Sequence, residues 1–172
     1  EGAALFPGPF VHVGGAECPR ARWNACPHCR RRMEAERLPD AAALQAWFVR
    51  RIGRHLAGLG KRLVGWDEIL DGAGSVPGSV LPHDAVVMSW RGFDGGIRAA
   101  RAGHDVVMTP TAHCYLDHYQ GPRKSEPPAF PADLPLGRAY AFEPGPPDLD
   151  AESAARVLGG QGNVWTERMR DW

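Results

Sequence analysis

The sequence lacks the features that mark several large classes of protein. It has no excess charge, because 20 Lys and Arg residues balance 20 Asp and Glu residues, so no net field favours nucleic acid or an anionic membrane as a partner. No apolar run approaches the roughly 20 residues of a transmembrane helix, so we expect no membrane span. The chain opens at Glu1 without the basic start and apolar core of a signal peptide, and the sequence assigns no compartment.

Cysteine is also scarce, with 4 residues in 172, but three of the four lie close together. Residues 26–29 read Cys-Pro-His-Cys and Cys18 precedes them, which is the local spacing of a zinc knuckle. A fourth ligand would have to be His28 or the distant Cys114. A disulfide within the group is a second interpretation, and a helix-start loop with half-buried thiols is the third and simplest. The third interpretation needs no metal or cofactor. On the first, the candidate metal ligands are Cys18, Cys26 and Cys29.

Three residue types are abundant instead. The 21 Gly and 16 Pro residues indicate many tight loops between short elements. The 6 Trp residues exceed what core packing usually needs, and indole rings stack well on flat, partly apolar ligands. A chain of 172 residues is long enough for one domain with a real core.

Apolar residues at three- and four-residue steps predict one long helix, from residues 39–40 to residues 58–60. We expect Trp47 and Phe48 to be core residues of this helix. The preceding residues 19–37 are polar and basic, and we expect a loop and a solvated helix face there. The apolar positions of the helix are Leu44, Trp47, Phe48, Ile52, Leu56 and Leu59.

Short apolar runs alternate with helical patterns along the rest of the chain. We expect helices over 95–103 and 151–158, and a proline-rich excursion over 121–150 that forms part of an active-site rim. The alternation predicts an α/β fold with a parallel sheet covered on both faces. An eight-stranded barrel needs about 250 residues, so this chain holds part of a β/α barrel. The expected strands are 11–13, 62–66, 85–90, 105–109 and 162–165.

Aromatic and acidic residues gather where these strands end. Glu17 follows the Gly14-Gly15 pair after the first strand, as expected where the carboxyl-terminal rim of a barrel carries chemistry. Three other strands end in Trp66, Trp90 and Trp165. Any one of these indoles could be a core residue, but three at strand ends favour a site. Aromatic walls with a few carboxylates suit a sugar, and the acids beyond the later strands are Asp117 and Glu167.

Five motifs in this order resemble those of the β-N-acetylhexosaminidases of glycoside hydrolase family 20. They are residues 12–17 (HVGGAE), 65–68 (GWDE), 89–92 (SWRG), 115–120 (YLDHYQ) and 163–167 (NVWTE). The resemblance implies a (β/α)₈ catalytic domain of which residues 1–172 are the C-terminal part, about strands four to eight. The first three strands, with a sugar-binding arginine, would lie before Glu1. The remainder of the barrel is then an obligatory partner, and we expect the isolated chain to aggregate at its unpaired strand edges.

The resemblance also implies a reaction and a role for each site residue. The family hydrolyses terminal GlcNAc or GalNAc with retention, and the substrate's own 2-acetamido oxygen is the nucleophile. Glu17 would be the general acid and then the base, with a pKa raised by partial burial. Tyr115 would orient the acetamido oxygen, while Asp117 and Glu167 would hold sugar hydroxyls. The clasp around the acetamido methyl would be Trp66, Trp90 and Trp165.

The sequence departs from the family at Ala16, where the motif has aspartate. That carboxylate accepts the acetamido N–H and stabilises the positive intermediate, and alanine does neither. We expect a loss of about 10²–10³ in rate. Two main hypotheses follow, an impaired exo-β-N-acetylhexosaminidase and a non-catalytic homologue that binds N-acetylhexosamine. A zinc-stabilised interaction domain built on the three clustered cysteines is a third.

Overall fold

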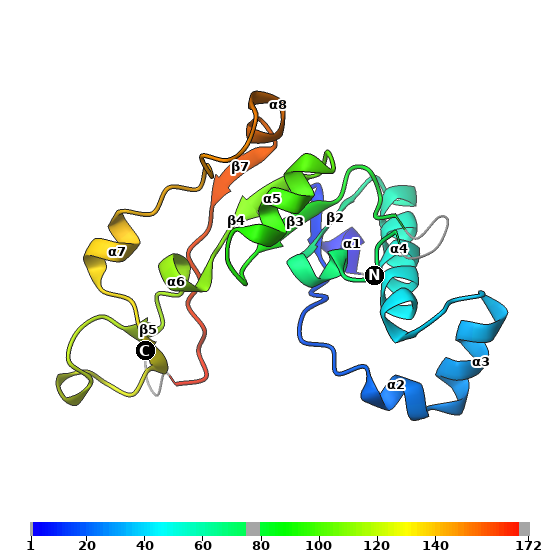
Figure 1. Ribbon diagram of the computed structural model, residues 1–172, viewed down its shortest axis with the longest axis horizontal. Helices are drawn as coiled ribbons and strands as arrows, with labels where there is room; N and C mark the ends of the chain where they lie inside the picture. Colours follow the sequence, from blue (N-terminus) through cyan, green and yellow to red (C-terminus); the bar gives the residue numbers. More distant parts are fainter. Residues whose placement is uncertain (1, 75–79, 169–172) are drawn as a thin grey trace.

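The chain folds around one parallel sheet (Figure 1), in a computed structural model that describes residues 2–74 and 80–168. The strand order is β1-β2-β3-β4-β7, and every neighbouring pair is parallel. Parallel neighbours need long crossovers, which helices supply here. The predicted α/β class is therefore confirmed. The strands are β1 (Phe10–His12), β2 (Arg62–Trp66), β3 (Val86–Ser89), β4 (Asp105–Met108) and β7 (Val157–Gly160).

Two helices, α4 (Ala41–Gly58) and α5 (Asp94–Arg101), cover one face of this sheet. Asp40 begins α4, because its side chain accepts a hydrogen bond of 2.8 Å from the Ala43 backbone N–H. Apolar side chains of both helices and alternate strand residues form the main core. Its largest fully buried members include Leu63, Ile69, Met108, Val87 and Val106.

The opposite face of the sheet carries a second, smaller cluster of side chains. Val64, Val86 and Met88 alternate with the residues that face the helices, as the pleat of a strand requires. Among the described residues, the members of this cluster and the side chains packed on it all come from strands. The sheet was expected to be covered on both faces, and strand side chains occupy its second face, as they do in the interior of a β/α barrel.

The last strand lies earlier in the chain than predicted. Asp150 caps only a four-residue helix, α8 (Ala151–Ala154), and the following residues form β7 beside β4. Gly159 and Gly160 therefore do not follow the end of a helix over 151–158, as was expected. They belong to the strand, where a Cβ on Gly160 would lie 2.5 Å from the Phe142 ring. The predicted strand over 162–165 is wrong, and that segment is attached by a single bridge between Tyr115 and Asn163.

The basic segment forms two short helices, α2 (Ala21–Ala25) and α3 (Pro27–Ala35), beside the first turns of α4. Trp47 packs in a small cluster with Trp23 and Met33, so its predicted burial is partly met. Phe48 is 52% exposed and the prediction for it is wrong. Phe48 lines an open cavity between α3 and α4 instead of packing in a core cluster.

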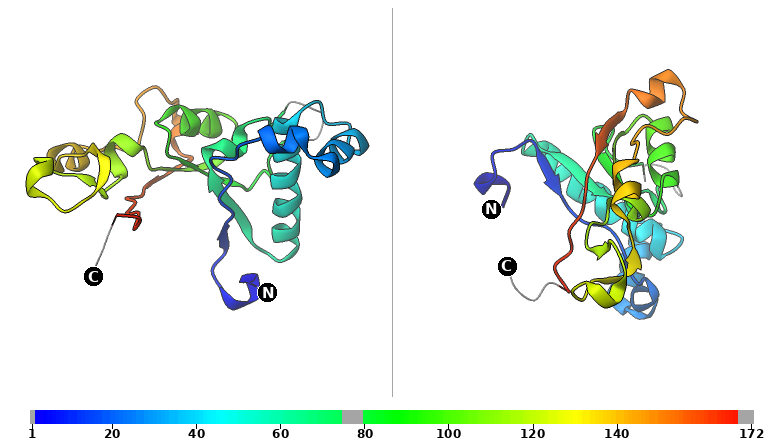
Figure 2. Two further views of the ribbon diagram at one scale, coloured as in Figure 1. Left: turned by 90° about the horizontal axis from the view of Figure 1, so that it is seen from below. Right: turned by 90° about the vertical axis from the view of Figure 1, so that its left-hand side faces the viewer.

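The proline-rich excursion folds at the other end of the molecule, away from α2 and α3 (Figures 1 and 2). A two-stranded sheet joins β5 (His118–Tyr119) to β6 (Phe130–Asp133) there. No described helix is long and apolar enough to cross a membrane. The remaining elements are α1 (Gly2–Leu5), η1 (Asp67–Leu70), α6 (Thr111–Cys114), η2 (Arg123–Ser125) and α7 (Leu136–Tyr140).

Candidate active site

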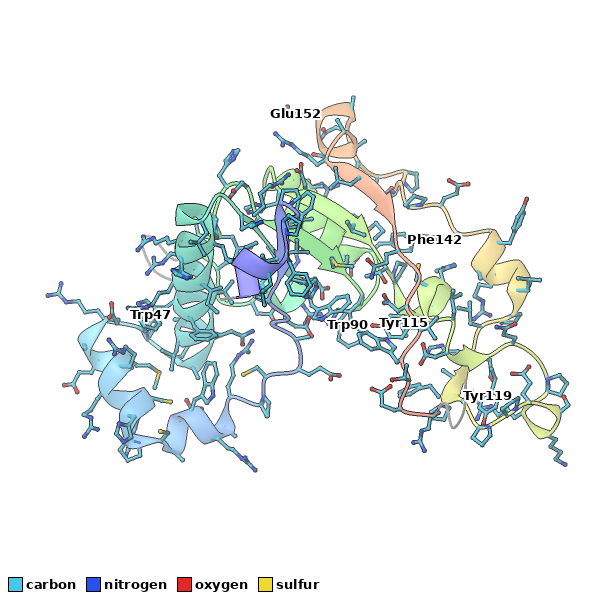
Figure 3. The ribbon with its side chains drawn as sticks, turned by 180° about the vertical axis from the view of Figure 1, so that it is seen from behind. Trp47, Trp90, Tyr115, Tyr119, Phe142 and Glu152 are labelled. Carbon is cyan, nitrogen blue, oxygen red and sulfur yellow. The ribbon has the colours of Figure 1, made fainter. Side chains whose placement is uncertain are left out.

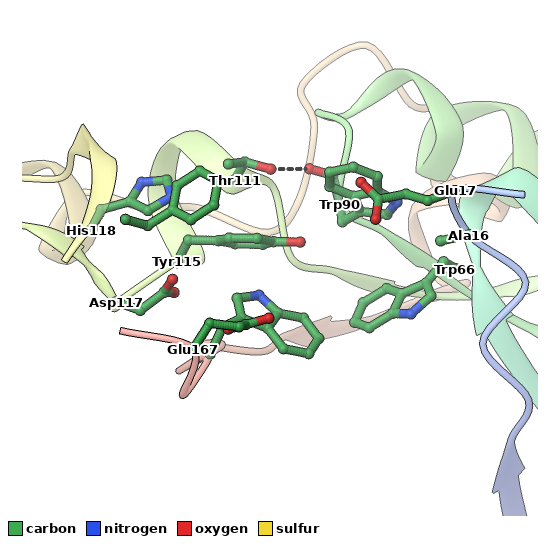
Figure 4. A pocket seen from close by; sticks show the side chains of 11 residues that line it. Ala16, Glu17, Trp66, Trp90, Thr111, Tyr115, Asp117, His118 and Glu167 are labelled. Atoms are coloured by element: carbon green, nitrogen blue, oxygen red, sulfur yellow. Dashed lines mark hydrogen bonds between the residues drawn. The ribbon is translucent and has the colours of Figure 1, made fainter. Parts of the chain in front are cut away.

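The eight predicted site residues all line one pocket at the carboxyl-terminal ends of the strands (Figure 4). The pocket holds about 260 Å³, near the lower end of the range for ligand pockets, roughly 300–1,000 Å³. A volume of this size suits one sugar ring better than a longer chain. The eight residues are Ala16, Glu17, Trp66, Trp90, Tyr115, Asp117, Trp165 and Glu167.

Glycines bring Glu17 to the pocket. After β1 the backbone turns at Gly14 and Gly15, which have φ angles of +71° and +94°. A Cβ at Gly15 would lie 2.5 Å from the buried Ile69 side chain, so only glycine fits there. Glu17 follows with φ of +52°, a left-handed conformation that costs a residue with a side chain about 1–2 kcal/mol.

The Glu17 side chain is exposed, although partial burial was expected. The loop that carries it projects from the rim of the sheet, where no described element covers its outer side. The structure therefore places this carboxyl at the pocket mouth and in contact with solvent.

Four aromatic rings form a continuous series around the pocket. The centroids of Trp66 and Trp165 are 6.0 Å apart, and those of Trp165 and Tyr115 are 6.1 Å apart. Tyr115 then stacks on Trp90 at 6.4 Å with an interplanar angle of 25°. We call these four residues the aromatic cage. In Figure 3, Trp90 and Tyr115 lie together in the middle of the molecule, away from Trp47 on α4.

Trp165 reaches the cage without being the end of a strand. Asn163 fixes its approach, because this buried residue donates a hydrogen bond of 2.7 Å from Nδ2 to Thr109 Oγ1 at the end of β4. The Asn163 backbone also accepts from Leu116 N–H at 2.8 Å and donates to the Cys114 carbonyl at 2.7 Å. The segment that carries Trp165 is thereby fastened beside Tyr115.

Tyr115 is suited to donate a hydrogen bond. Burial raises the pKa of its hydroxyl above the ordinary value, so the group stays protonated at neutral pH. Beside it, Asp117 Oδ1 and His118 Nε2 are buried atoms that have no hydrogen-bond partner within the described chain. Buried polar atoms normally have partners, so each of these two atoms needs a polar group from outside the described residues, either water or a ligand.

Three further residues line the pocket and were not predicted as site residues: Thr111, His118 and Phe130. His118 lies inside the YLDHYQ motif, which was the available signal. Phe130 comes from the proline-rich excursion, and its stacking on His118 at 5.5 Å fits the expected rim. Thr111 donates a hydrogen bond of 2.8 Å to the Trp90 carbonyl (Figure 4), and only the fold brings these two residues together.

A group of charged residues, of which Asp67 and Glu68 are buried, lies behind the pocket. Trp90 Nε1 donates to Glu68 Oε2 at 2.8 Å. Asp67 accepts from Arg91 Nε at 3.1 Å, and the same guanidinium pairs with Asp71 at 3.3 Å. Burial, with a hydrogen bond to Glu68, raises the pKa of Asp67 to about 6 against the opposing effect of Arg91. The GWDE motif was recognised in the sequence, but no role was predicted for its two acids.

The clustered cysteines lie outside the pocket. Cys26 is the N-cap residue of α3 and Cys29 is in its first turn, and both are half-buried free thiols. Across the residues that the structure describes, no three His, Cys, Asp or Glu side chains are grouped to hold a metal ion. The helix-start interpretation is the one that matches this geometry.

Comparison with known proteins agrees with the geometry. Residues 1–172 match the model of the glycosyl hydrolase family 20 catalytic domain. A β-hexosaminidase of Porphyromonas gingivalis is 48% identical over 168 residues, which are 97% of this chain and 21% of that protein. The chain thus spans about a fifth of that relative's length.

Solved structures of a family 20 exo-β-N-acetylglucosaminidase from Vibrio harveyi are also similar, at 36% identity. An inactive aspartate-to-alanine mutant superposes with a TM-score of 0.83, and a complex with N-acetylglucosamine with a TM-score of 0.80. Both matches cover 98% of this chain and 26% of the other. Since the solved relatives are TIM barrels, the five-stranded sheet is part of such a barrel. The chain belongs to glycosyl hydrolase family 20.

Proposed function

We propose that residues 1–172 are the C-terminal part of a (β/α)₈ catalytic domain, about strands four to eight, with the remainder of the barrel before Glu1. The complete domain is a retaining exo-β-N-acetylhexosaminidase that hydrolyses terminal non-reducing GlcNAc or GalNAc. Membership of the family and the similarity to β-hexosaminidases support this proposal. The remainder of the barrel and an N-acetylhexosamine glycan are its partners.

The aromatic cage with one carboxyl at its mouth is the observation that carries the proposal. Rings of Trp66, Trp165 and Trp90 offer apolar faces to sugar C–H groups and to the acetamido methyl. The partnerless Asp117 oxygen supplies an acceptor for a sugar hydroxyl, and Glu167 at the same pocket supplies another. The small volume suits a single terminal residue, which is what an exo-acting enzyme binds.

The first step forms a bond within the substrate. The acetamido oxygen, aimed by the Tyr115 hydroxyl, attacks the anomeric carbon as the glycosidic bond breaks. Glu17 gives its proton to the departing oxygen, so the leaving group departs as a neutral alcohol. The products of this step are an oxazolinium ion and the Glu17 carboxylate.

The second step reverses the proton transfer. The Glu17 carboxylate takes a proton from water as the water oxygen attacks the anomeric carbon and the oxazolinium ring opens. Two inversions give net retention, and Glu17 is protonated again for the next cycle. No cofactor takes part.

Ala16 limits this chemistry. A carboxylate at this position would accept the acetamido N–H and offset the positive charge of the ring, and a methyl group does neither. In the Vibrio harveyi relative an aspartate-to-alanine substitution gives an inactive enzyme, so the loss of a single carboxylate can inactivate a member of this family. The cage is untouched by Ala16, so sugar binding survives.

The test restores the missing carboxylate in the complete domain. With a chromogenic GlcNAc glycoside, Ala16→Asp is expected to raise kcat/KM by about 10²–10³-fold. Ala16→Asn is the matched control, because it supplies a hydrogen-bond acceptor without charge and should recover less. Glu17→Gln in the Ala16→Asp background should abolish the gain.

The absence of a family carboxylate favours one alternative, a non-catalytic homologue that binds N-acetylhexosamine. Its signature would be GlcNAc binding with no turnover in either the Ala16 or the Ala16→Asp protein. Turnover in the Ala16→Asp protein would reject the alternative.

A further inference from the structure

Glu68 lies directly behind the aromatic cage. It follows β2 in the short helix η1, and the residue is 7% exposed. Glu68 is absent from the pocket lining, so it does not touch a ligand there. Any effect of this carboxyl group on the site must therefore act through its neighbours.

The two carboxyl oxygens of Glu68 reach two different parts of the site. Oε2 accepts the indole N–H of Trp90 at 2.8 Å. Oε1 accepts the backbone N–H of Glu17 at 3.4 Å, a longer contact than the first. One buried side chain thus joins a wall of the cage to the loop that carries the pocket's exposed carboxyl.

The Glu17 loop needs such a support. Glu17 holds a left-handed backbone conformation, which persists only where surrounding contacts enforce it. Gln45 adds a second tie, since its Nε2 donates to the Gly15 carbonyl at 3.0 Å and to the Glu68 carbonyl at 3.4 Å. Both ties run from the Glu17 loop to the same residue of η1.

Charged neighbours hold Glu68 itself in place. Arg91 Nε lies 4.0 Å from Glu68 Oε2. Arg91 also pairs with Asp67 and Asp71. The rotamer of Glu68 is therefore fixed from behind while its oxygens face Trp90 and Glu17.

We propose that Glu68 is a positioning residue that sets the place of Glu17 relative to the indole of Trp90 through one shared carboxyl group. The proposal rests on the proposed function, in which Glu17 is the general acid and Trp90 clasps the sugar. Replacing a residue that orients a catalytic group typically lowers activity by about 10- to 100-fold.

Glu68→Gln in the complete domain is the main test, because it keeps the shape but turns one acceptor into a donor that opposes Trp90 or Glu17. Two readouts separate the two contacts. GlcNAc affinity, measured by tryptophan fluorescence in the Ala16 protein, reports the Trp90 contact. The kcat in the Ala16→Asp background reports the Glu17 contact, with an expected loss of about 10- to 100-fold and a smaller change in KM.

Asp105→Asn is the matched control, since Asp105 is a partly buried carboxyl paired with Arg62 and Arg156 at the start of β4, and it contacts neither Trp90 nor Glu17. It should leave kcat and affinity within about twofold. Trp90→Phe removes the indole donor from the other side and covers the case in which Glu68→Gln folds poorly. In GlcNAc affinity, the double variant should cost little more than Trp90→Phe alone, because Trp90→Phe already removes the hydrogen bond to Glu68.

The outcomes separate the two proposals. If the Ala16→Asp parent neither turns over the glycoside nor binds GlcNAc, the proposed function fails and this inference fails with it. If the parent is active and Glu68→Gln matches it in kcat and GlcNAc affinity, the inference alone is overturned. A loss limited to thermal stability, equal in Glu68→Gln and Asp105→Asn, would also overturn it.

Discussion

The strand-end site buries two acidic side chains behind the cage, whereas the α2–α3 segment exposes its charged side chains. Behind the cage, the side chain of Asp67 is 2% exposed and that of Glu68 is 9% exposed, and both lie within 4.0 Å of Arg91. On α3, the side chains of the Arg32–Glu36 pair are 52% and 35% exposed. Buried charges must be paired, and their partners then fix geometry. Exposed charges are solvated and constrain the positions of their neighbours only weakly.

The cavities of the two regions differ in the same way. The cavity between α3 and α4 is larger, at about 570 Å³, than the strand-end pocket, at about 260 Å³. Its lining includes Trp23, Trp47 and Arg31 but no carboxylate. Volume alone would therefore point to the cavity between α3 and α4. The combination of carboxylates with stacked rings points instead to the strand-end pocket.

The largest expected effect comes from the buried acid Asp67. Its pKa is raised to about 6 in the folded chain, so its contribution to stability is complete below its unfolded pKa of about 4 and is lost as pH rises through about 6. Asp67→Asn stays neutral at every pH. Its free energy of unfolding should therefore rise relative to that of the parent by up to about 3 kcal/mol from pH 4 to pH 8. Urea unfolding of the complete domain at both pH values measures this difference. If Asp67→Asn differed from the parent by the same free energy of unfolding at pH 4 and at pH 8, the raised pKa of Asp67 would be contradicted.

A smaller effect is expected from Gly95, which packs α5 against the same acid. A Cβ at Gly95 would lie 2.3 Å from Asp67 Oδ2 and 2.7 Å from Asp67 Cβ. Gly95→Ala should lower the free energy of unfolding by about 1–3 kcal/mol. Gly58→Ala in α4 is the control, because a Cβ there meets nothing within 4 Å, and it should be neutral or stabilising by up to about 1 kcal/mol. Equal unfolding midpoints for the two variants would remove the packing argument.

The smallest effect is expected on α3. Arg32 Nη1 pairs with Glu36 Oε1 at 3.2 Å on an exposed helix face. Glu36→Gln breaks this ion pair but keeps Arg32 over the Trp47 ring, and it should change the free energy of unfolding by about 0.5 kcal/mol or less. Thermal unfolding in low and high salt is the measurement. A loss as large as that of Gly95→Ala would erase the contrast between the two regions.

Local patterns predicted four of the five strands of the main sheet and the helices α4 and α5. The bounds of β2 were correct, and the start of α4 at its Asp40 cap followed from the capping residue and the apolar period. The errors lie where tertiary contacts override local preference. Val157 and the glycines after it form a strand because β4 offers an unpaired edge. Phe48 is exposed because α3 leaves an open cavity on its side of α4.

The sequence by itself predicted eight of the eleven residues that line the strand-end pocket. Strand ends of a parallel sheet meet at one edge, so acids and indoles placed after several strands must converge there, and all eight predicted residues do line one pocket. Only the tertiary structure decided how they are held. The contact from Glu68 to Trp90 joins two strand ends that are 22 residues apart, and hydrogen bonds depend on distance and angle, which no local pattern encodes.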